Sequence, residues 1–316
     1  MSDVAILPLE TVERARRPAV GYLMALTAGT LFAINGTVSK VILESGLSSL
    51  RLTEVRCIGG FLGLLAIVLL TRPRTLRIDW RELLLVAGFG VFGVAFVQLF
   101  YFLGIHRLQI GVSLLIQYLG PLIVAVFAHF VLHEHVRRRL WVALALALIG
   151  LTLVVDLWSG VSLDGLGVLF SLCSAFTFAG YMLFAERALR RRDPISLLCY
   201  GFLFASIFWS LVQPWWSFPF EVPRQTVSLL GHLSDTNLPV WALMAWMIVL
   251  GTIVPFLLIV GSMRHISATR AGIVAMVEPV VASAVAYAWL NETLSGAQLV
   301  GGAIVLLAIV LAQSAR

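Results

Sequence analysis

The chain has 316 residues, of which 60% are hydrophobic and only 12% are charged. A soluble domain of this length cannot use so much apolar surface, because its exterior must face water, whereas lipid accepts apolar side chains on the outside. The formal net charge of +6 would suit nucleic acid, but the basic residues fall in short loops between apolar blocks and leave no room for a groove-binding domain. Composition therefore predicts an integral membrane protein and excludes nucleic acid as a partner.

The N-terminal segment, residues 1–18, is predicted to be a cytoplasmic tail that carries Arg14, Arg16 and Arg17. The apolar run that starts at Ala19 resembles the middle of a signal peptide, but it has no clear cleavage site of the small-x-small type. We therefore expect this run to be a retained first helix.

Ten stretches of about 20 apolar residues follow one another along the chain. They are predicted at 19–43, 50–70, 82–104, 109–132, 139–156, 165–186, 195–216, 239–263, 268–290 and 296–314. The predicted fold class is an all-α polytopic membrane protein with ten transmembrane helices. Three cysteines, Cys57, Cys173 and Cys199, lie within these stretches without ligand-like spacing, so neither a disulfide framework nor a metal or other cofactor is expected.

Basic residues are distributed unequally between the two sides of the predicted bundle. An even number of spans puts both termini on one side, and that side holds 17 of the 22 Lys and Arg residues, against three in the opposite loops. Excess Lys and Arg marks the cytoplasmic side, so both termini are predicted to be cytoplasmic.

The two halves of the chain repeat one pattern. Gly120–Pro121 is followed by Glu134, 13 residues after the proline, and Glu278–Pro279 is followed at the same distance by Glu292. This pairing has an offset of 158 residues. Near the start of each half the better offset is 144, which aligns Asn35–Gly36 with Ala179–Gly180, because the connection at 214–238 is longer than its counterpart at 71–81. The repeats are predicted at residues 19–157 and 162–314.

Each repeat has five predicted spans, and an odd number forces the second copy to lie inverted in the membrane relative to the first. Inverted repeats related by an in-plane pseudo-twofold axis are typical of secondary transporters, whose substrate sites lie near the midplane between the repeats. The pattern therefore predicts a transporter that works by alternating access.

Several motifs resemble the drug/metabolite transporter superfamily, in particular its ten-span family of two EamA-type units. The matching residues are Glu278–Pro279 with the run Leu290 to Leu294, and the weaker partner Gly120–Pro121 with Leu132 to Val136. The run Asn35 to Lys40 at the end of the first span, and Arg56 early in the second, also fit. The resemblance covers about residues 19–314.

This resemblance implies export of amino acids or related metabolites across the bacterial cytoplasmic membrane, with no enzymatic activity. The run Tyr118 to Pro121 is also similar to a Tyr-Leu-x-Pro stretch of aromatic amino-acid exporters. The chain departs from that subgroup because a glutamate, Glu278, precedes the second proline. Neutral amino acids, including aromatic ones, are therefore the expected substrates, and nucleosides or drugs remain the alternative.

Glu278 is the only acidic residue deep inside a predicted span. A buried carboxylate in hydrocarbon is costly unless it is paired, so ionisable groups inside membranes are functional candidates. Glu278 fits either a countercharge for a substrate ammonium or a proton-coupling site, with the proton as a further partner. A structural hydrogen bond between spans is the alternative.

Pro121 and Pro279 lie near the centres of the fourth and ninth predicted spans. A proline within a helix removes one backbone hydrogen bond and frees the carbonyl four residues earlier, here that of Gln117 or Ala275. Such carbonyls are tolerated where they line a polar cavity. We predict two helix kinks at the substrate site, and the alternative is a bend that only shapes the bundle.

Polar and aromatic residues near these positions complete the predicted substrate site. Gln98 and Tyr101 share one side of the third span, roughly with His106, and amides and phenols at lipid depth face protein or water. Packing or hydrogen bonds between helices would explain the same residues. The predicted substrate-binding residues are Asn35, Gln98, Tyr101, Gln117, Tyr118, Phe178, Tyr181, Met276 and Glu278.

Other charged residues have simpler explanations. Lys40 is expected to extend to the interface, and Arg56 is expected to behave similarly, paired with Glu54 or Glu44. The run His133–Glu134–His135 does not have the H-E-x-x-H spacing of a zinc site.

Two other classes of membrane protein remain to be weighed. An intramembrane enzyme would need a nucleophile with a base or a metal-binding pair, and neither pattern occurs within the predicted spans. A channel is the other alternative, and saturation of the flux would distinguish it from a carrier.

Overall fold

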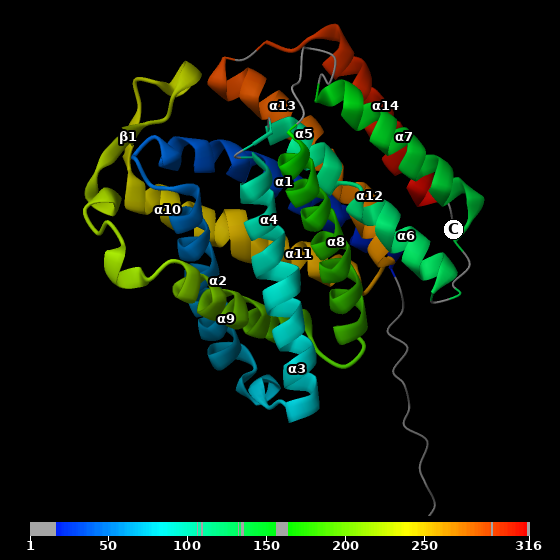
Figure 1. Cartoon of the computed structure of the whole chain (residues 1–316), viewed down its shortest axis with the longest axis horizontal. Coiled ribbons are helices and arrows are strands. Elements are labelled where there is room, and N and C mark those ends of the chain that lie inside the picture. The colour runs from blue at the N-terminus through cyan, green and yellow to red at the C-terminus, as the bar shows by residue number, and fades with distance from the viewer. Residues whose placement is uncertain are drawn as a thin grey trace, which may run out of the picture.

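The computed structural model describes residues 17–105, 107–108, 110–131, 133, 136–155, 164–291 and 293–314. This part of the chain forms a bundle of helices with one short two-stranded hairpin (Figure 1). Nine helical spans among the described residues are long and apolar enough to cross a bilayer, and a further apolar helix, α7 (Arg138–Val154), has 17 residues. The protein is an all-α polytopic membrane protein, which confirms the predicted fold class.

Six spans in the described part of the chain are continuous, and four contain a break. The continuous spans are α1 (Pro18–Leu43), α2 (Ser49–Thr71), α7, α8 (Gly165–Ala188), α9 (Pro194–Val212) and α14 (Gly296–Ser314). The broken spans are α3 (Trp80–Gly88) with η2 (Phe89–Ala95) and α4 (Phe96–Ile105), α5 (Ile110–Gln117) with α6 (Gly120–Phe130), α10 (Val240–Ile248) with η6 (Val249–Ile253) and α11 (Val254–Ser262), and α12 (Ala268–Ala275) with α13 (Val277–Leu290). The breaks fall in the third and fourth spans of each half.

Short polar side chains start many of the helices. A Ser or Asp side chain before a helix accepts a hydrogen bond from one of the first backbone amides, which have no partner within the helix. Such caps are made by Ser48 to the amide of Arg51, Asp164 to Gly167, Asp193 to Ile195 and Ser196, and Ser267 to Arg270. In these four spans, a residue of the preceding loop therefore fixes where the helix begins.

Helices from different halves of the chain pack most extensively against each other. These pairs are α7 with α14, α2 with α9, α4 with α8, α1 with α11, and α1 with α13. In the repeat, α1 corresponds to α8, α2 to α9, α4 to α11 and α7 to α14. The pairs α7 with α14 and α2 with α9 therefore join equivalent helices, and the contact of α1 with α11 is equivalent to that of α8 with α4. The contact of α1 with α13 is likewise equivalent to that of α8 with α6. This pairing is what a pseudo-twofold relation between two five-span repeats produces.

Close packing at glycines holds the fifth and tenth spans together. A Cβ atom on Gly150 of α7 would lie 2.8 Å from the carbonyl oxygen of Gly301, and one on Gly301 of α14 would lie 2.6 Å from that of Gly150. The two backbones therefore approach as closely as they do because neither residue has a side chain, which is a common way for helices to associate in lipid. The two helices run side by side in Figure 1.

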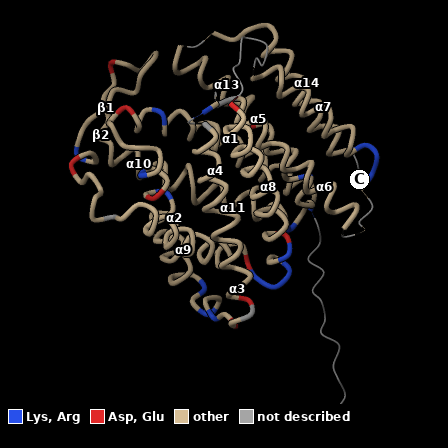
Figure 2. The backbone as a smooth tube through the Cα atoms, in the orientation of Figure 1, with Lys and Arg blue, Asp and Glu red and all other residues tan. Residues whose placement is uncertain are grey.

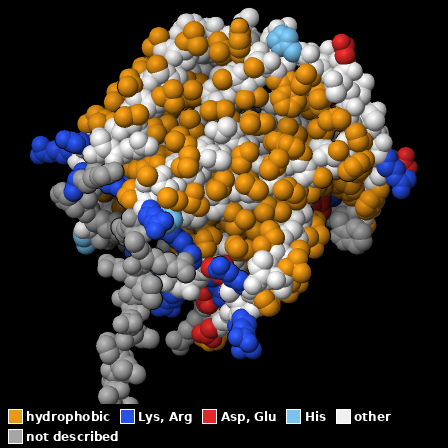
Figure 3. Space-filling model, turned by 180° about the vertical axis from the view of Figure 1, so that it is seen from behind, with side chains coloured by type: hydrophobic (Ala, Val, Ile, Leu, Met, Phe, Trp, Pro, Cys, Tyr) orange, Lys and Arg blue, Asp and Glu red, His pale blue; other side chains and the backbone are white. Residues whose placement is uncertain are grey.

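Apolar side chains cover much of the face shown in Figure 3, and charged residues lie mostly at helix ends and in connections (Figure 2). Large exposed hydrophobic residues include Leu70, Leu211 and Trp216. A surface of this kind suits contact with lipid rather than water.

The longer second-half connection predicted at 214–238 has structure of its own. It contains η3 (Trp215–Ser217), η4 (Val222–Arg224), β1 (Thr226–Ser228), η5 (Gly231–Leu233) and β2 (Asn237–Pro239), and β1 pairs antiparallel with β2. Val222, Val227 and Leu229 from this connection pack in one cluster with residues of α1 and α10. Its counterpart in the first half contains η1 (Pro73–Leu76).

Some residues that the sequence singled out lie outside the described part of the chain. They are Arg14, Arg16, His106, Glu134, His135 and Glu292.

Candidate substrate site

Glu278 lies in the first turn of α13, directly after the break between α12 and α13. A carboxylate at this position is favoured by the exposed amides at the helix N-terminus. The Tyr118 hydroxyl donates a hydrogen bond of 2.8 Å to Glu278 Oε2. Tyr101, on α4, also interacts electrostatically with Glu278. The site thus joins three residues that the sequence proposed, from three different spans.

Tyr118 itself lies at the equivalent break of the first repeat, between the end of α5 and the start of α6. The helices α5 and α6 on either side correspond to the single predicted span at 109–132, which is interrupted just before Pro121. The two broken helices therefore face each other through the contact between Tyr118 and Glu278. In the second repeat, the break also lies just before its proline, Pro279.

Arg56 is a site residue that the sequence analysis did not assign to the substrate site. Its Nε donates to Thr252 Oγ1 at 3.2 Å and its Nη2 to the Gly251 carbonyl at 3.5 Å. The Arg56 guanidinium and the Glu278 carboxylate also interact electrostatically. An opposite pair of charges from the two repeats therefore lies within the helical bundle.

The expected pairing of Arg56 with Glu54 or Glu44 is wrong. Glu54 forms an ion pair of 2.7 Å with Arg51, one turn earlier on the same helix, so its carboxylate is engaged. Arg56 follows 1.4 turns after Arg51 on the 3.6-residue helical repeat and therefore points elsewhere, toward η6. The clue in the sequence was the presence of an ionisable residue inside the second predicted span.

Both hydrogen-bond partners of Arg56, Thr252 and Gly251, belong to a π-helical segment. The π-helical segments η2 and η6 end at Ala95 and Ile253, which are 158 residues apart, the same offset that relates Pro121 to Pro279. In η6, the Thr252 hydroxyl donates to the Met247 carbonyl at 2.9 Å while it accepts from Arg56. Segments of this type recur at functional sites because they displace backbone groups from the regular helical pattern.

Asn35 lies beside the same segment. A Cβ atom on Gly251 would collide with the Asn35 side-chain amide, so the two residues are in direct contact. Among the described residues, Asn35 Oδ1, Gln98 Oε1 and the Tyr181 hydroxyl are buried polar atoms without a hydrogen-bond partner. Buried polar atoms usually have partners. Glu54 Oε1 and Trp209 Nε1 share this property in the described chain, so it is not confined to the residues proposed for the substrate site.

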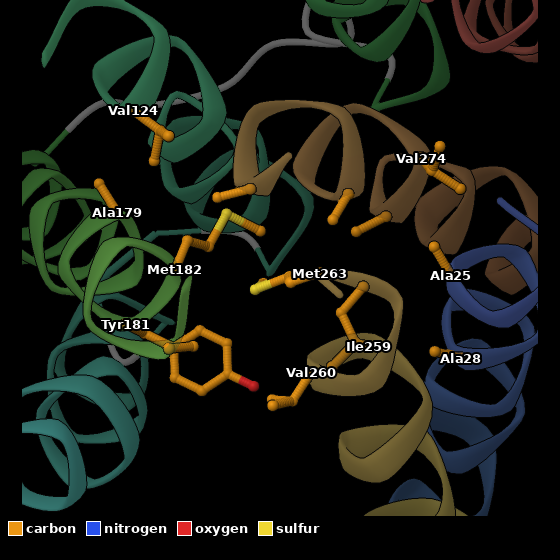
Figure 4. Close-up of a cluster of buried hydrophobic side chains, with 14 of the residues drawn as sticks. Ala25, Ala28, Val124, Ala179, Tyr181, Met182, Ile259, Val260, Met263 and Val274 are labelled. Atoms are coloured by element: carbon orange, nitrogen blue, oxygen red, sulfur yellow. The ribbon is translucent and has the colours of Figure 1, made fainter. Parts of the chain in front are cut away.

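Aromatic rings enclose the Tyr118 side of the site. The Phe178 ring lies 6.3 Å from Tyr118 in an edge-to-face arrangement and 6.3 Å from Tyr181 in a stacked one. Tyr181 also meets Phe256 of α11 edge to face at 6.2 Å. Figure 4 shows Tyr181 projecting from α8 toward Val260 of α11. Phe178 and Tyr181 thus lie between the broken spans of both repeats.

Two further predicted residues, Gln117 and Met276, lie next to the breaks. Gln117 ends α5 and is partly exposed, and within the described chain its side chain makes no hydrogen bond to Glu278. Met276 is buried at the junction of α12 and α13, where it supports the break through packing. Among the described residues, no group of three or more His, Cys, Asp or Glu side chains is arranged to hold a metal ion.

The repeats differ at equivalent positions of their breaks. Gly120 is the counterpart of Glu278, and a Cβ atom on Gly120 would lie 2.6 Å from the Phe178 ring. The first break therefore carries an aromatic contact where the second carries a carboxylate. Chemically, Glu278 can accept hydrogen bonds from a small molecule and Arg56 can donate them.

Comparisons with known proteins match the whole length of this bundle. The model of the EamA-like transporter family matches residues 19–156 and again 165–313. An uncharacterized transporter of Archaeoglobus fulgidus is 27% identical over 280 residues, which cover 88% of this chain and 91% of that protein. The uncharacterized transporter YwfM of Bacillus subtilis is 25% identical over 300 residues, or 93% of each chain.

A solved crystal structure has the same fold, with a TM-score of 0.73 at 17% sequence identity over 93% of this chain and 96% of the other. At this identity the likeness concerns the fold alone. The two family matches correspond to the two five-span halves, and together they cover most of the sequence. The chain therefore belongs to the EamA-like transporter family, and its activity is membrane transport.

Proposed function

We propose that this transporter is a secondary carrier that exports small zwitterionic metabolites, and neutral amino acids in particular, by alternating access. The observation that carries the proposal is the electrostatic pair of Arg56 and Glu278 beside two helix breaks. An amino acid has a carboxylate and an ammonium on one carbon, so it can engage both residues at once. Charge-assisted hydrogen bonds of this kind are stronger than neutral ones.

The environment of the pair supports a zwitterion over a singly charged substrate. Each charge is costly to leave unpaired inside a bundle surrounded by lipid. A zwitterion brings one charge for each residue and leaves the net charge of the site unchanged. The guanidinium uses two of its five N–H groups in contacts with Thr252 and Gly251. Its other donors supply the contact with a carboxylate.

Protons are the proposed coupling ion, and Glu278 is the residue that carries them. A proton and a substrate ammonium both neutralise one carboxylate, so they bind it alternately. Alternating occupancy of a single site by two ligands couples their movements in opposite directions. The carrier would thus use an inward proton gradient to export its substrate. The proposed location is the bacterial cytoplasmic membrane with both termini cytoplasmic, and the unequal distribution of Lys and Arg supports this orientation.

Counterflow in proteoliposomes tests this proposal. Liposomes loaded with unlabelled L-leucine or L-phenylalanine should accumulate the labelled amino acid, and the initial rate should saturate with its concentration. A pH gradient that is acidic on the side opposite to the substrate should raise the initial rate. Uptake that rises linearly without saturation would identify a channel. A well-folded protein that carries neither amino acid would remove neutral amino acids as the substrate class.

The substitution Glu278→Gln tests the assigned residue. It removes the negative charge and keeps the shape, and a lost hydrogen bond to a charged group lowers the rate by about tenfold or more. Glu221→Gln is the matched control, because Glu221 is exposed and lies in the 213–239 connection. Membrane insertion of both variants should equal that of the wild type. Wild-type counterflow by Glu278→Gln would contradict the role of this carboxylate.

A further inference from the structure

The carbonyl of Ala275 has lost its usual helical partner. In a helix this oxygen would accept from the amide four residues later, but residue 279 is a proline and has no amide hydrogen. The Tyr118 hydroxyl lies 3.2 Å from the Ala275 carbonyl oxygen and takes the place of the missing donor. A side chain from the first repeat therefore completes the backbone of the broken helix in the second.

The same hydroxyl is also the partner of Glu278, at the shorter distance of 2.8 Å. A tyrosine hydroxyl has a single proton, so it can make one strong hydrogen bond at a time. An ionised carboxylate is a stronger acceptor than a backbone carbonyl, so an unoccupied Glu278 holds the proton. A ligand cation or a proton on Glu278 weakens this acceptor and releases the hydroxyl to Ala275.

The ring of Tyr118 is fixed while its proton is free to change partners. Tyr118 is 4% exposed and packs edge to face on Phe178. Its counterpart in the second repeat is Met276, which has no hydroxyl, so the device exists at one of the two breaks only. It also joins the two halves of the chain, whose relative movement alternating access requires.

We propose that Tyr118 is a positioning residue that links occupancy of the Glu278 carboxylate to the stiffness of the break between α12 and α13. With Glu278 ionised and empty, Tyr118 holds the carboxylate and the Ala275 carbonyl lacks a full donor. With Glu278 neutralised, the Tyr118 hydroxyl donates to the Ala275 carbonyl, and α12 and α13 behave more nearly as one helix. This inference rests on the proposed function only in taking Glu278 as the residue that the substrate neutralises.

Hydrogen–deuterium exchange of the purified protein in detergent tests the link without any substrate. Glu278→Gln mimics a neutralised carboxylate, so we expect the backbone amides of residues 276–278 and 280–283 to exchange about fivefold more slowly than in the wild type, as the gain of one hydrogen bond predicts. Tyr118→Phe keeps the ring on Phe178 and removes the hydroxyl. These amides should then exchange at about the wild-type rate, because the hydroxyl of the wild type already donates to the ionised Glu278. The protection gained in Glu278→Gln should disappear in the double variant.

Tyr22→Phe is the matched control. Tyr22 is also buried and donates to a backbone carbonyl, that of Ala312 at 3.1 Å, but it joins α1 to α14 away from the site. Added to Glu278→Gln, this substitution should leave the gained protection at 276–283 unchanged. Effects of Tyr118→Phe and Glu278→Gln that simply add would show that Tyr118 only packs, and would overturn the proposal.

The single variant Glu278→Gln keeps the test decisive if Tyr118→Phe does not fold, because unchanged or faster exchange at 276–283 in that variant would also overturn the link. Failure of the link is distinguishable from failure of the proposed function. A silent counterflow panel together with the expected exchange pattern would remove amino acids as substrates and leave the role of Tyr118 standing.

Discussion

Arg56 and Glu278 are the two side chains on which the account of the site depends. A guanidinium and a carboxylate within a lipid-embedded bundle stabilise each other through their opposite charges, and neighbouring groups satisfy part of their hydrogen-bonding capacity. Neither is enclosed by hydrophobic residues alone, since Thr252, Tyr118 and Tyr101 surround them. This environment leaves both groups able to exchange partners with a ligand of matching charge.

The substitution Arg56→Lys tests the guanidinium at this scale. A lysine keeps the charge but loses the planar fork that binds a carboxylate through two parallel hydrogen bonds. We expect the concentration for half-maximal counterflow of L-leucine to rise about tenfold, as the loss of one charge-assisted hydrogen bond implies. Arg224→Lys, at an exposed arginine of η4, should leave this concentration unchanged. An unaltered half-saturation in Arg56→Lys would remove Arg56 from the binding site.

The sequence alone identified some of these residues, and physical reasons explain the others. Glu278 was recognisable because a carboxylate within a span is costly and therefore functional. Arg56 was assigned to the interface in the same way as Lys40, with Glu54 or Glu44 as its expected partner. Glu54 instead pairs with Arg51. Which of the two arginines a glutamate contacts depends on the directions of the side chains, and sequence spacing alone does not determine them.

At the scale of elements, the hydrophobic runs predicted the spans closely. The predicted span at 239–263 corresponds to Val240–Ser262, and the one at 19–43 corresponds to Pro18–Leu43. Lipid requires about 20 apolar residues for each crossing, so length and composition define a span without further information. The π-helical segments η2 and η6 were not predicted. Their backbone hydrogen bonds span one residue more than those of an α-helix, and this difference does not change the amino-acid composition of the span.

The hairpin of β1 and β2 was not predicted either. Its strands have three residues each, and the sequence analysis treated 214–238 only as a long connection between two spans. Its position depends on contacts with distant helices, such as the bond of 2.8 Å from Trp289 Nε1 to the Leu229 carbonyl. Contacts of this range are invisible to a local pattern.

The break before Pro279 has a testable effect on its own helix. Pro279→Ala supplies the backbone amide at residue 279 to which the Ala275 carbonyl can bond, so α12 and α13 should join into one helix. The midpoint of thermal unfolding should then rise by about 2–4 °C. A stiffer span should also lower the maximal counterflow rate severalfold. Pro194→Ala is the control, because a proline at the first position of a helix costs no hydrogen bond. A variant with raised stability and full wild-type rate would show that the break is dispensable.

At the scale of the whole molecule, helix contacts between the two halves form the framework. Each half contributes helices to every extensive pair, so neither repeat has a complete core of its own. The helix contacts of one half are therefore equivalent to those of the other. The charged residues of the site break this symmetry, because Arg56 lies in the first half and Glu278 in the second. The sequence predicted the repeat from the matching proline and glutamate positions, but it could not show which spans from opposite halves would pack together.

The contact of α7 with α14 is the place to test this framework. Gly150→Ala places a methyl group 2.8 Å from the Gly301 carbonyl, so the helices must separate and the unfolding midpoint should fall by about 2–4 °C or more. Gly88→Ala is the control, because a Cβ atom there meets nothing within 4 Å. Equal midpoints for the two variants would show that the fifth and tenth spans pack less closely than described.

The central claim is that one substrate engages both Arg56 and Glu278, and competition with analogues of a single amino acid tests it most directly. Counterflow of labelled L-leucine by the wild-type protein would be measured against unlabelled leucine, isocaproate and isopentylamine, which have both charged groups, the carboxylate alone and the ammonium alone. The account predicts that leucine competes at least about tenfold more strongly than either analogue, because each analogue loses a charge-assisted hydrogen bond. Equal competition by leucine and either analogue would contradict it.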